Sequence, residues 1–308
     1  MKNLVLTFGL IFLGHLAFGQ FLTLKSVREV KEGNLILGLS ENKELNKDLI
    51  AVANTWWTYS EITEHLPLEQ AKARAKADPN TFVLSLAYVE VEGMQKKNFD
   101  PDRRQIGYAS GWEEDFGWPP ITTGVRFEIE NGHKPAFAFQ YIPTVGEAGV
   151  TKESMVFGIS ALNDIFTTMK RDSLSNVFKL MKALKSNTGV LKEKELLIPE
   201  GYLHKKVSEE YVKSSYSGKA DVVDFPTWRE AILNQSEDAV YCTIVAVPTG
   251  STYSYQHWFM EAATGKIIAI VYAKVAVNMA GSNLSSGNKE YITKKLVDKY
   301  EKAYQGKW

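Results

Sequence analysis

The sequence has a single cysteine, Cys242, among its 308 residues. One thiol excludes an internal disulfide and a zinc site built from cysteines. An excess of charge is also missing, because 36 Lys and Arg residues balance 36 Asp and Glu residues. This balance is not typical of a general nucleic-acid-binding protein, which carries a basic excess, nor of an acidic disordered chain. The 44% hydrophobic and 12% aromatic residues indicate instead a folded chain with a well-filled core.

The sequence also lacks the short motifs of well-known enzymes. It has no phosphate-binding loop, no Gly-x-Gly-x-x-Gly, no His-Glu-x-x-His and no Gly-x-Ser-x-Gly. His65, His133, His204 and His257 are scattered, and their spacing predicts no metal site. We interpret His257 as a histidine at a sheet edge. The sequence therefore predicts no cofactor and no metal, and it favours a protein that is not an enzyme.

The first residues have the pattern of a secretory leader. Lys2 is followed by the mostly apolar segment Leu4–Leu16, and small residues in Ala17-Phe18-Gly19 precede Gln20. This pattern predicts a signal peptide at 1–19 and an exported chain, periplasmic or extracellular. The leader resembles those of Gram-negative bacteria. No later segment is apolar enough to predict a membrane span.

The two halves of the sequence resemble each other. Three pairs of segments match at offsets of 159 to 161 residues: Leu66-Pro67 with Phe225-Pro226, Phe82–Tyr88 with Tyr241–Val247, and Asn34–Gly38 with Glu195–Pro199. In the first of these pairs, each proline stands where a short helix is expected to begin. The other two pairs are runs typical of buried strands. These matches predict an internal duplication.

Each half then continues with a predicted hairpin and a closing helix. Val125–Glu130 alternates and turns at Asn131-Gly132, and helices are expected at Ser154–Met169 and Lys289–Tyr304. Each copy thus has the order β-α-β-α-β-β-β-α. We predict a tandem duplication of a three-layer α/β sandwich with a mixed sheet. This order loosely resembles thioredoxin-like and Rossmann-like folds, but without a Cys-x-x-C motif the resemblance implies no activity.

The predicted domains follow from this duplication. The first copy spans 20–171 and carries an insertion at 92–122, and the second copy spans 195–308. Residues 172–194 are expected to form a connecting helix with one apolar stripe, made of Leu174, Val177, Phe178, Met181 and Leu184. Trp56, Trp57 and Tyr59 are expected in a strand that packs into the core. Cys242 is expected in a buried strand, where a thiol is usually inert.

The insertion is the feature that distinguishes the first copy, which has roughly 25 extra residues before its hairpin. Its candidate binding residues are Tyr108, Trp112, Glu113, Asp115, Phe116 and Trp118. In one interpretation they form an exposed aromatic surface for a sugar ring or a protein partner. In the other, the segment folds back and its tryptophans plug the core. If Val83–Val91 is a parallel strand, the insertion leaves at its carboxyl end, where open α/β sheets bind ligands.

These features favour an exported, non-catalytic binding or interaction protein of the bacterial cell envelope. Its partner would be an envelope protein or a glycan, not a nucleic acid. Two alternatives stay open: an exported hydrolase with a site between the two copies, and a structural subunit of an envelope assembly.

Overall fold

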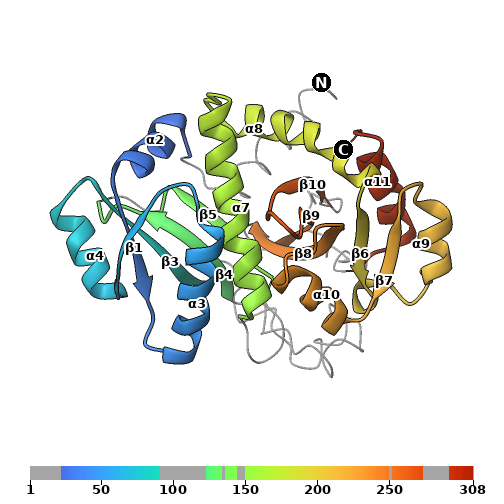
Figure 1. The fold of residues 1–308 in the computed structure, drawn as a ribbon, viewed down its shortest axis with the longest axis horizontal. Coiled ribbons are helices and arrows are strands. Elements are labelled where there is room, and N and C mark those ends of the chain that lie inside the picture. Colours follow the sequence, from blue (N-terminus) through green and yellow to red (C-terminus); the bar gives the residue numbers. More distant parts are fainter. Residues whose placement is uncertain are drawn as a thin grey trace. The chain divides into compact units, whose positions relative to one another are not determined.

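The computed structural model describes residues 22–90, 123–133, 136–143, 150–249, 252–272 and 291–307. These residues form two compact units (Figure 1). Unit 1 contains the described residues up to Val89, those of Val125–Ile142 and Lys152–Ala183, and unit 2 contains the other described residues, mainly the chain from Leu184 onward.

Unit 1 is built on a five-stranded sheet with the order β2-β1-β3-β4-β5. Its elements are α2 (Leu24–Glu32), β1 (Asn34–Leu39), α3 (Lys43–Trp56), β2 (Ile62–Pro67), α4 (Leu68–Ala77), β3 (Thr81–Glu90), β4 (Thr123–Glu130), β5 (Ala138–Tyr141), α7 (Lys152–Arg171) and α8 (Val177–Leu184). Strand β1 runs parallel to both of its neighbours, β2 and β3, whereas β4 and β5 are antiparallel.

Unit 2 has a five-stranded sheet with the order β7-β6-β8-β9-β10. Its elements are η3 (Lys185–Lys192), β6 (Glu195–Pro199), η4 (Glu200–Tyr202), α9 (Glu209–Ser215), β7 (Ala220–Val223), α10 (Phe225–Leu233), β8 (Ala239–Thr249), β9 (Thr252–Glu261), β10 (Ile267–Tyr272) and α11 (Lys294–Tyr304). Strand β6 is parallel to β7 and β8, and β9 is antiparallel to β8 and β10.

The two sheets have the same strand order when β1 to β5 are matched with β6 to β10. The helices between the strands match as well, since α3, α4 and α7 take the places of α9, α10 and α11. The helices that precede the first strand of each sheet match too. Helix α2 precedes β1 and contacts α7, and η3 precedes β6 and contacts α11, the counterpart of α7. The predicted tandem duplication, with β-α-β-α-β-β-β-α in each copy, is confirmed.

Helices cover both faces of each sheet, which gives the predicted three layers. In the order 2-1-3 the crossover from β1 to β2 and the crossover from β2 to β3 run in opposite directions. Right-handed connections therefore place their helices on opposite faces. In unit 2, Tyr241 of β8 packs against Trp228 of α10, with ring centroids 5.9 Å apart. The next residue, Cys242, points to the other face and contacts Tyr300 of α11.

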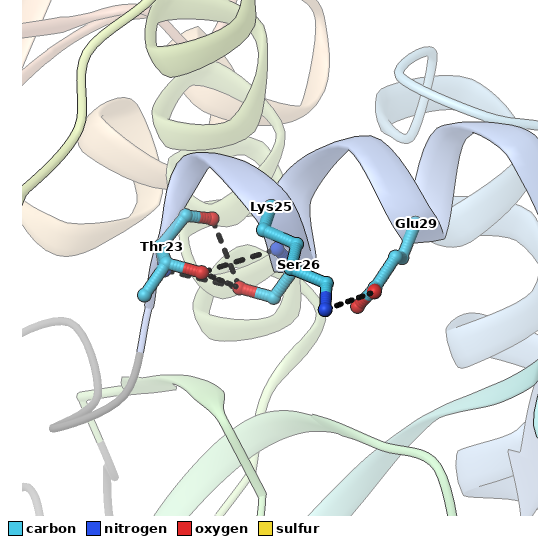
Figure 2. Close-up of polar contacts among 4 residues, drawn as sticks. All are labelled: Thr23, Lys25, Ser26 and Glu29. Carbon is cyan, nitrogen blue, oxygen red and sulfur yellow. Dashed lines mark hydrogen bonds and ion pairs between the residues drawn. The ribbon is translucent and has the colours of Figure 1, made fainter.

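Helix α2 begins at a well-formed N-terminal cap, which Figure 2 shows. Thr23 Oγ1 accepts a hydrogen bond from the backbone N–H of Ser26, and Ser26 Oγ accepts one from the backbone N–H of Thr23. This capping box satisfies two N–H groups that a helix start leaves unpaired. The exposed pair Lys25–Glu29, at 3.7 Å, adds little to stability. Burial of Val27 then fixes the helix on unit 1.

Trp56, Trp57 and Tyr59 lie in the core as expected, but not in a strand. Trp56 is the last residue of α3, because it continues the helically spaced buried positions of that helix. The three side chains are only 8%, 4% and 5% exposed. Trp57 and Tyr59 both pack edge-on against Phe166 of α7. The predicted strand was therefore wrong and the predicted core role is confirmed.

The segment after α7 also differs from the sequence prediction. Helix α8 begins at Val177, later than the expected start at 172, because Ser173 has a positive φ of 51° that interrupts the helix. Its inward positions are Val177, Leu180 and Leu184, which are 4%, 0% and 0% exposed. Phe178 falls about 100° away from that row and is 42% exposed. Phe178 is thus not part of the buried apolar stripe.

Gly158 of α7 gives a direct test of packing in unit 1. A Cβ at this position would clash with Phe127 of β4 and with Ile142. We expect Gly158→Ala to lower the free energy of unfolding by about 1–3 kcal/mol through overpacking, despite the better helix propensity of alanine. Gly189→Ala is the matched control, since no atom lies within 4 Å of its Cβ position. Urea unfolding measures both variants, and equal stabilities would contradict the packing.

Candidate functional site

The insertion is anchored at the carboxyl end of a parallel strand. Strand β3 pairs in parallel with β1, from Asn34 opposite Thr81 to Gly38 opposite Ser85. The parallel direction on which the expected ligand site depends is therefore present. Strands β3 and β4 are neighbours in the sheet, yet residues 91–122 separate them. Their counterparts in unit 2, β8 and β9, are separated by residues 250–251 alone.

The anchor also coincides with the point where the sheet topology changes direction. The chain passes from β1 to β2 on one side of β1 and then crosses back to β3 on the other side. The two crossover helices, α3 and α4, therefore lie on opposite faces of the sheet. In open α/β sheets, the carboxyl ends of two such strands are where ligands bind. In unit 1 this position lies between the ends of β1 and β3.

A rigid polar loop follows β1 at the same edge. Asn46 Oδ1 accepts a hydrogen bond from the backbone N–H of Ser40 at 3.0 Å, and Asn46 Nδ2 donates to the Ser40 carbonyl at 2.7 Å. Asn42 caps α3, because its side chain accepts from the N–H groups of Glu44 and Leu45, each at 3.1 Å. These bonds hold exposed hydroxyl and amide groups in fixed positions beside the β1 end. The cap pattern Ser-x-Asn after a strand is a usable sequence signal for this loop, although it was not among the predicted features.

Tyr88 is the described aromatic residue nearest to the insertion. It lies near the end of β3 and is 60% exposed, and with Phe178 it is one of two exposed large hydrophobic residues in the described ranges. Desolvation raises the pKa of its hydroxyl above the ordinary tyrosine value, so the phenol is neutral at physiological pH. Tyr88 therefore offers an apolar ring with a polar tip at this edge.

The matching edge of unit 2 is filled by aromatic packing. Tyr202 follows β6, is 2% exposed, and packs edge-on against Phe225 and Trp228 at centroid distances of 5.4 and 6.5 Å. Trp228 Nε1 donates a hydrogen bond to the Cys242 carbonyl at 3.0 Å. The polar loop is thus a property of unit 1, although the two units share their strand order.

The candidate residues predicted from the sequence lie outside the described residues. These are Tyr108, Trp112, Glu113, Asp115, Phe116 and Trp118. The structure describes the strands that anchor their segment, β3 and β4, together with the polar loop and Tyr88 beside the β3 end.

Unit 2 contains a buried cluster of reactive side-chain types. Tyr300 Oη lies 2.6 Å from His257 Nδ1 and 3.5 Å from Cys242 Sγ, and Cys242 and His257 are fully buried. Burial raises the pKa of Cys242 to about 12, against a smaller lowering by the hydrogen bond to Tyr300. The same burial raises the pKa of Tyr300 well above its ordinary value. Both groups therefore stay protonated at physiological pH. The predicted burial of Cys242 in a strand is confirmed.

The expected position of His257 was wrong. Strand β9 lies between β8 and β10, and His257 is paired with Ile244 on one side and Val271 on the other. It is a central residue of the sheet, not an edge residue. Sequence alone could not show this, because the central position of β9 follows from the strand order of the sheet.

The described ranges contain neither a metal-binding cluster nor a membrane span. In these ranges no three His, Cys, Asp or Glu side chains gather closely enough to hold a metal ion. No helix there is both long enough and apolar enough to cross a bilayer. Comparison with known proteins found no matching family model, no matching curated protein and no matching solved structure.

The buried cluster predicts how Cys242 reacts. We expect the native protein to resist a thiol reagent such as DTNB at pH 8, because the thiol is fully buried and its pKa is about 12. The same reagent should label one thiol at once in denaturant. Tyr88→Cys is a positive control, since that position is 60% exposed. Fast labelling of native Cys242 would contradict the buried cluster.

Proposed function

We propose that this chain is an exported, non-catalytic binding protein of the bacterial cell envelope. Its binding residues belong to the insertion at 92–122, which follows the carboxyl end of β3. The observation that carries the proposal is the difference between two units of the same strand order. Of the matched strand pairs β3–β4 and β8–β9, only the first is joined by a long insertion. That insertion leaves β3 at the edge where open α/β sheets bind ligands.

The chemistry of the segment supports a glycan or a protein as the partner. Trp112, Phe116 and Trp118 provide flat apolar rings that suit the face of a sugar or a pocket on a protein. Glu113 and Asp115 add hydrogen-bond acceptors to the same segment. Tyr88 and the polar loop of Ser40, Asn42 and Asn46 extend this mixed aromatic and polar character onto the sheet edge. The leader at 1–19 supports export of the chain to where such partners occur.

Replacing the tryptophans tests the binding role. We expect Trp112→Ala and Trp118→Ala each to weaken binding by about 30-fold or more, since an aromatic anchor contributes about 2 kcal/mol or more. Binding is measured with detergent-solubilised envelope protein and with purified envelope glycan. Phe178→Ala is the matched control, because it removes an exposed aromatic residue from another element. Unchanged binding with both variants would contradict the proposal.

Shortening the insertion separates the two interpretations of its tryptophans. The variant replaces residues 91–122 by Gly-Ser, the pair at 250–251 that joins the counterpart strands in unit 2. We expect it to keep its free energy of unfolding, helped by about 0.6 kcal/mol for each halving of the loop length, and to lose partner binding. A loss of several kcal/mol in urea unfolding would show instead that the segment completes the core.

A further inference from the structure

The β4–β5 hairpin of unit 1 carries an ion pair on the face opposite α7. Phe127 of β4 packs against Gly158 of α7. Because successive strand residues alternate, Arg126 and Glu128 point to the other face. The Arg126 guanidinium donates hydrogen bonds to Glu128 Oε2, from Nε at 3.1 Å and from Nη2 at 2.9 Å. The two side chains are 18% and 11% exposed, so the pair is largely, but not fully, removed from water.

Two aromatic rings of β5 hold the guanidinium group in place. Its central carbon lies 4.3 Å from the centroid of the Phe139 ring and 5.7 Å from that of the Tyr141 ring. Arg126 Nη1 also donates a hydrogen bond to the Tyr141 hydroxyl at 3.4 Å. Both rings stand opposite the charged pair in the hairpin register. Four residues thus form the β4–β5 cluster: Arg126, Glu128, Phe139 and Tyr141.

The β4–β5 cluster keeps unused hydrogen-bonding groups. A guanidinium has five N–H groups, and the three bonds to Glu128 and Tyr141 leave the others without a partner in the described ranges. Both bonds to the carboxylate end on Oε2, so Glu128 Oε1 also has no hydrogen-bond partner among the described residues. The same small cluster therefore offers cationic donors and an anionic acceptor to a ligand.

The matched hairpin of unit 2 uses the corresponding face for packing. Gln256 and Trp258 of β9 lie opposite α11, because His257 between them contacts Tyr300 of that helix. Both are 0% exposed, and Trp258 Nε1 donates a hydrogen bond to Gln256 Oε1 at 3.1 Å. A largely buried ion pair is seldom more stabilising than apolar side chains of similar volume. Stability alone therefore does not account for the charged pair of unit 1, which argues for a role in binding.

We propose that the β4–β5 cluster binds an uncharged sugar through its hydroxyl groups. The two charges of the cluster cancel, and a carboxylate 2.9 Å from the guanidinium repels a second anion. A hydroxyl group both accepts and donates, so neighbouring hydroxyls can accept from Arg126 and donate to Glu128 Oε1. The rings of Phe139 and Tyr141 fix the plane of the guanidinium, which lowers the entropy cost of binding.

This chemistry favours a sugar over a protein segment as the ligand. The N–H and C=O groups of one trans peptide unit point in opposite directions, so one unit cannot reach both members of a tight ion pair. Two adjacent hydroxyls of a sugar project from the same edge of the ring and can reach both. The cluster contains no residue of the insertion at 92–122. The inference therefore goes beyond the proposed function and stands without it.

Affinity electrophoresis of the purified full chain tests the proposal. The native gels contain mannan, dextran, galactan or a soluble β-glucan as neutral polysaccharides, or alginate as an acidic one. We expect at least one neutral polysaccharide to retard the protein. The double variant Arg126→Gln/Glu128→Gln should weaken that binding by about tenfold or more, since hydrogen bonds to charged groups are lost. It removes both charges together, so no unpaired charge is left in the hairpin.

Two further variants keep the test independent of folding defects. Tyr141→Phe keeps the ring and removes only the hydroxyl, and we expect about threefold weaker binding. Lys72→Gln/Glu130→Gln is the matched control, because it removes another ion pair, at 3.1 Å, that ends on the same strand. This control should bind as the original protein does. An equal loss in the control would assign the effect to the stability of the hairpin and overturn the proposal.

Other outcomes overturn the proposal directly. These are binding to none of the neutral polysaccharides, and binding to alginate alone that salt abolishes, which would indicate an anion site. Neutral-polysaccharide binding that Trp112→Ala and Trp118→Ala abolish, while the cluster variants leave it unchanged, would assign the sugar to the insertion. That result overturns this proposal and leaves the proposed function intact, so the two fail separately.

Discussion

Parallel pairing of one central strand on both of its sides is the constraint from which the rest of each unit follows. Strand β1 lies between β2 and β3, and β6 lies between β7 and β8, with every one of these pairings parallel. Parallel neighbours require crossover helices, and right-handed crossovers in opposite directions cover opposite faces. The central strand is then buried on both faces, which is why Leu35, Ile36 and Leu37 are all 0–1% exposed.

This constraint explains how much of the fold could be predicted from the sequence. Buried parallel strands give continuous apolar runs, so Asn34–Gly38 and Phe82–Tyr88 were recognisable, and a proline marks the start of α4 and α10. The alternating pattern of the hairpin strands and the helical spacing of apolar residues predicted the remaining elements of each copy. The wrong predictions of secondary structure occur where the local sequence pattern fits more than one kind of element. Trp56 fits either a strand or a helix by its neighbours, and only the packing of α3 decides between them.

The place where the insertion leaves the sheet could be predicted from the sequence, but the surroundings of that place could not. The unequal loops between matched strands pointed to residues 92–122, and the parallel direction of β3 confirmed the edge of the sheet from which they leave. Exposure is a property of tertiary packing, so Tyr88 and Phe178 could not be recognised from hydrophobicity alone. The bonds between Ser40 and Asn46 are likewise visible only once β1 and α3 are placed.

The two-residue connection between β8 and β9, at 250–251, has a consequence for engineering. Its strands β8 and β9 occupy the same sheet positions as the pair that carries the long segment in unit 1. The fold already tolerates a long excursion between two such strands, and the closure entropy of a loop grows only slowly with its length. The chain is therefore a scaffold that carries a long segment at one of two matched positions and a two-residue connection at the other. A peptide inserted at 250–251 would be displayed from the second position, with the aromatic packing of Tyr202 and Trp228 unchanged in the same unit.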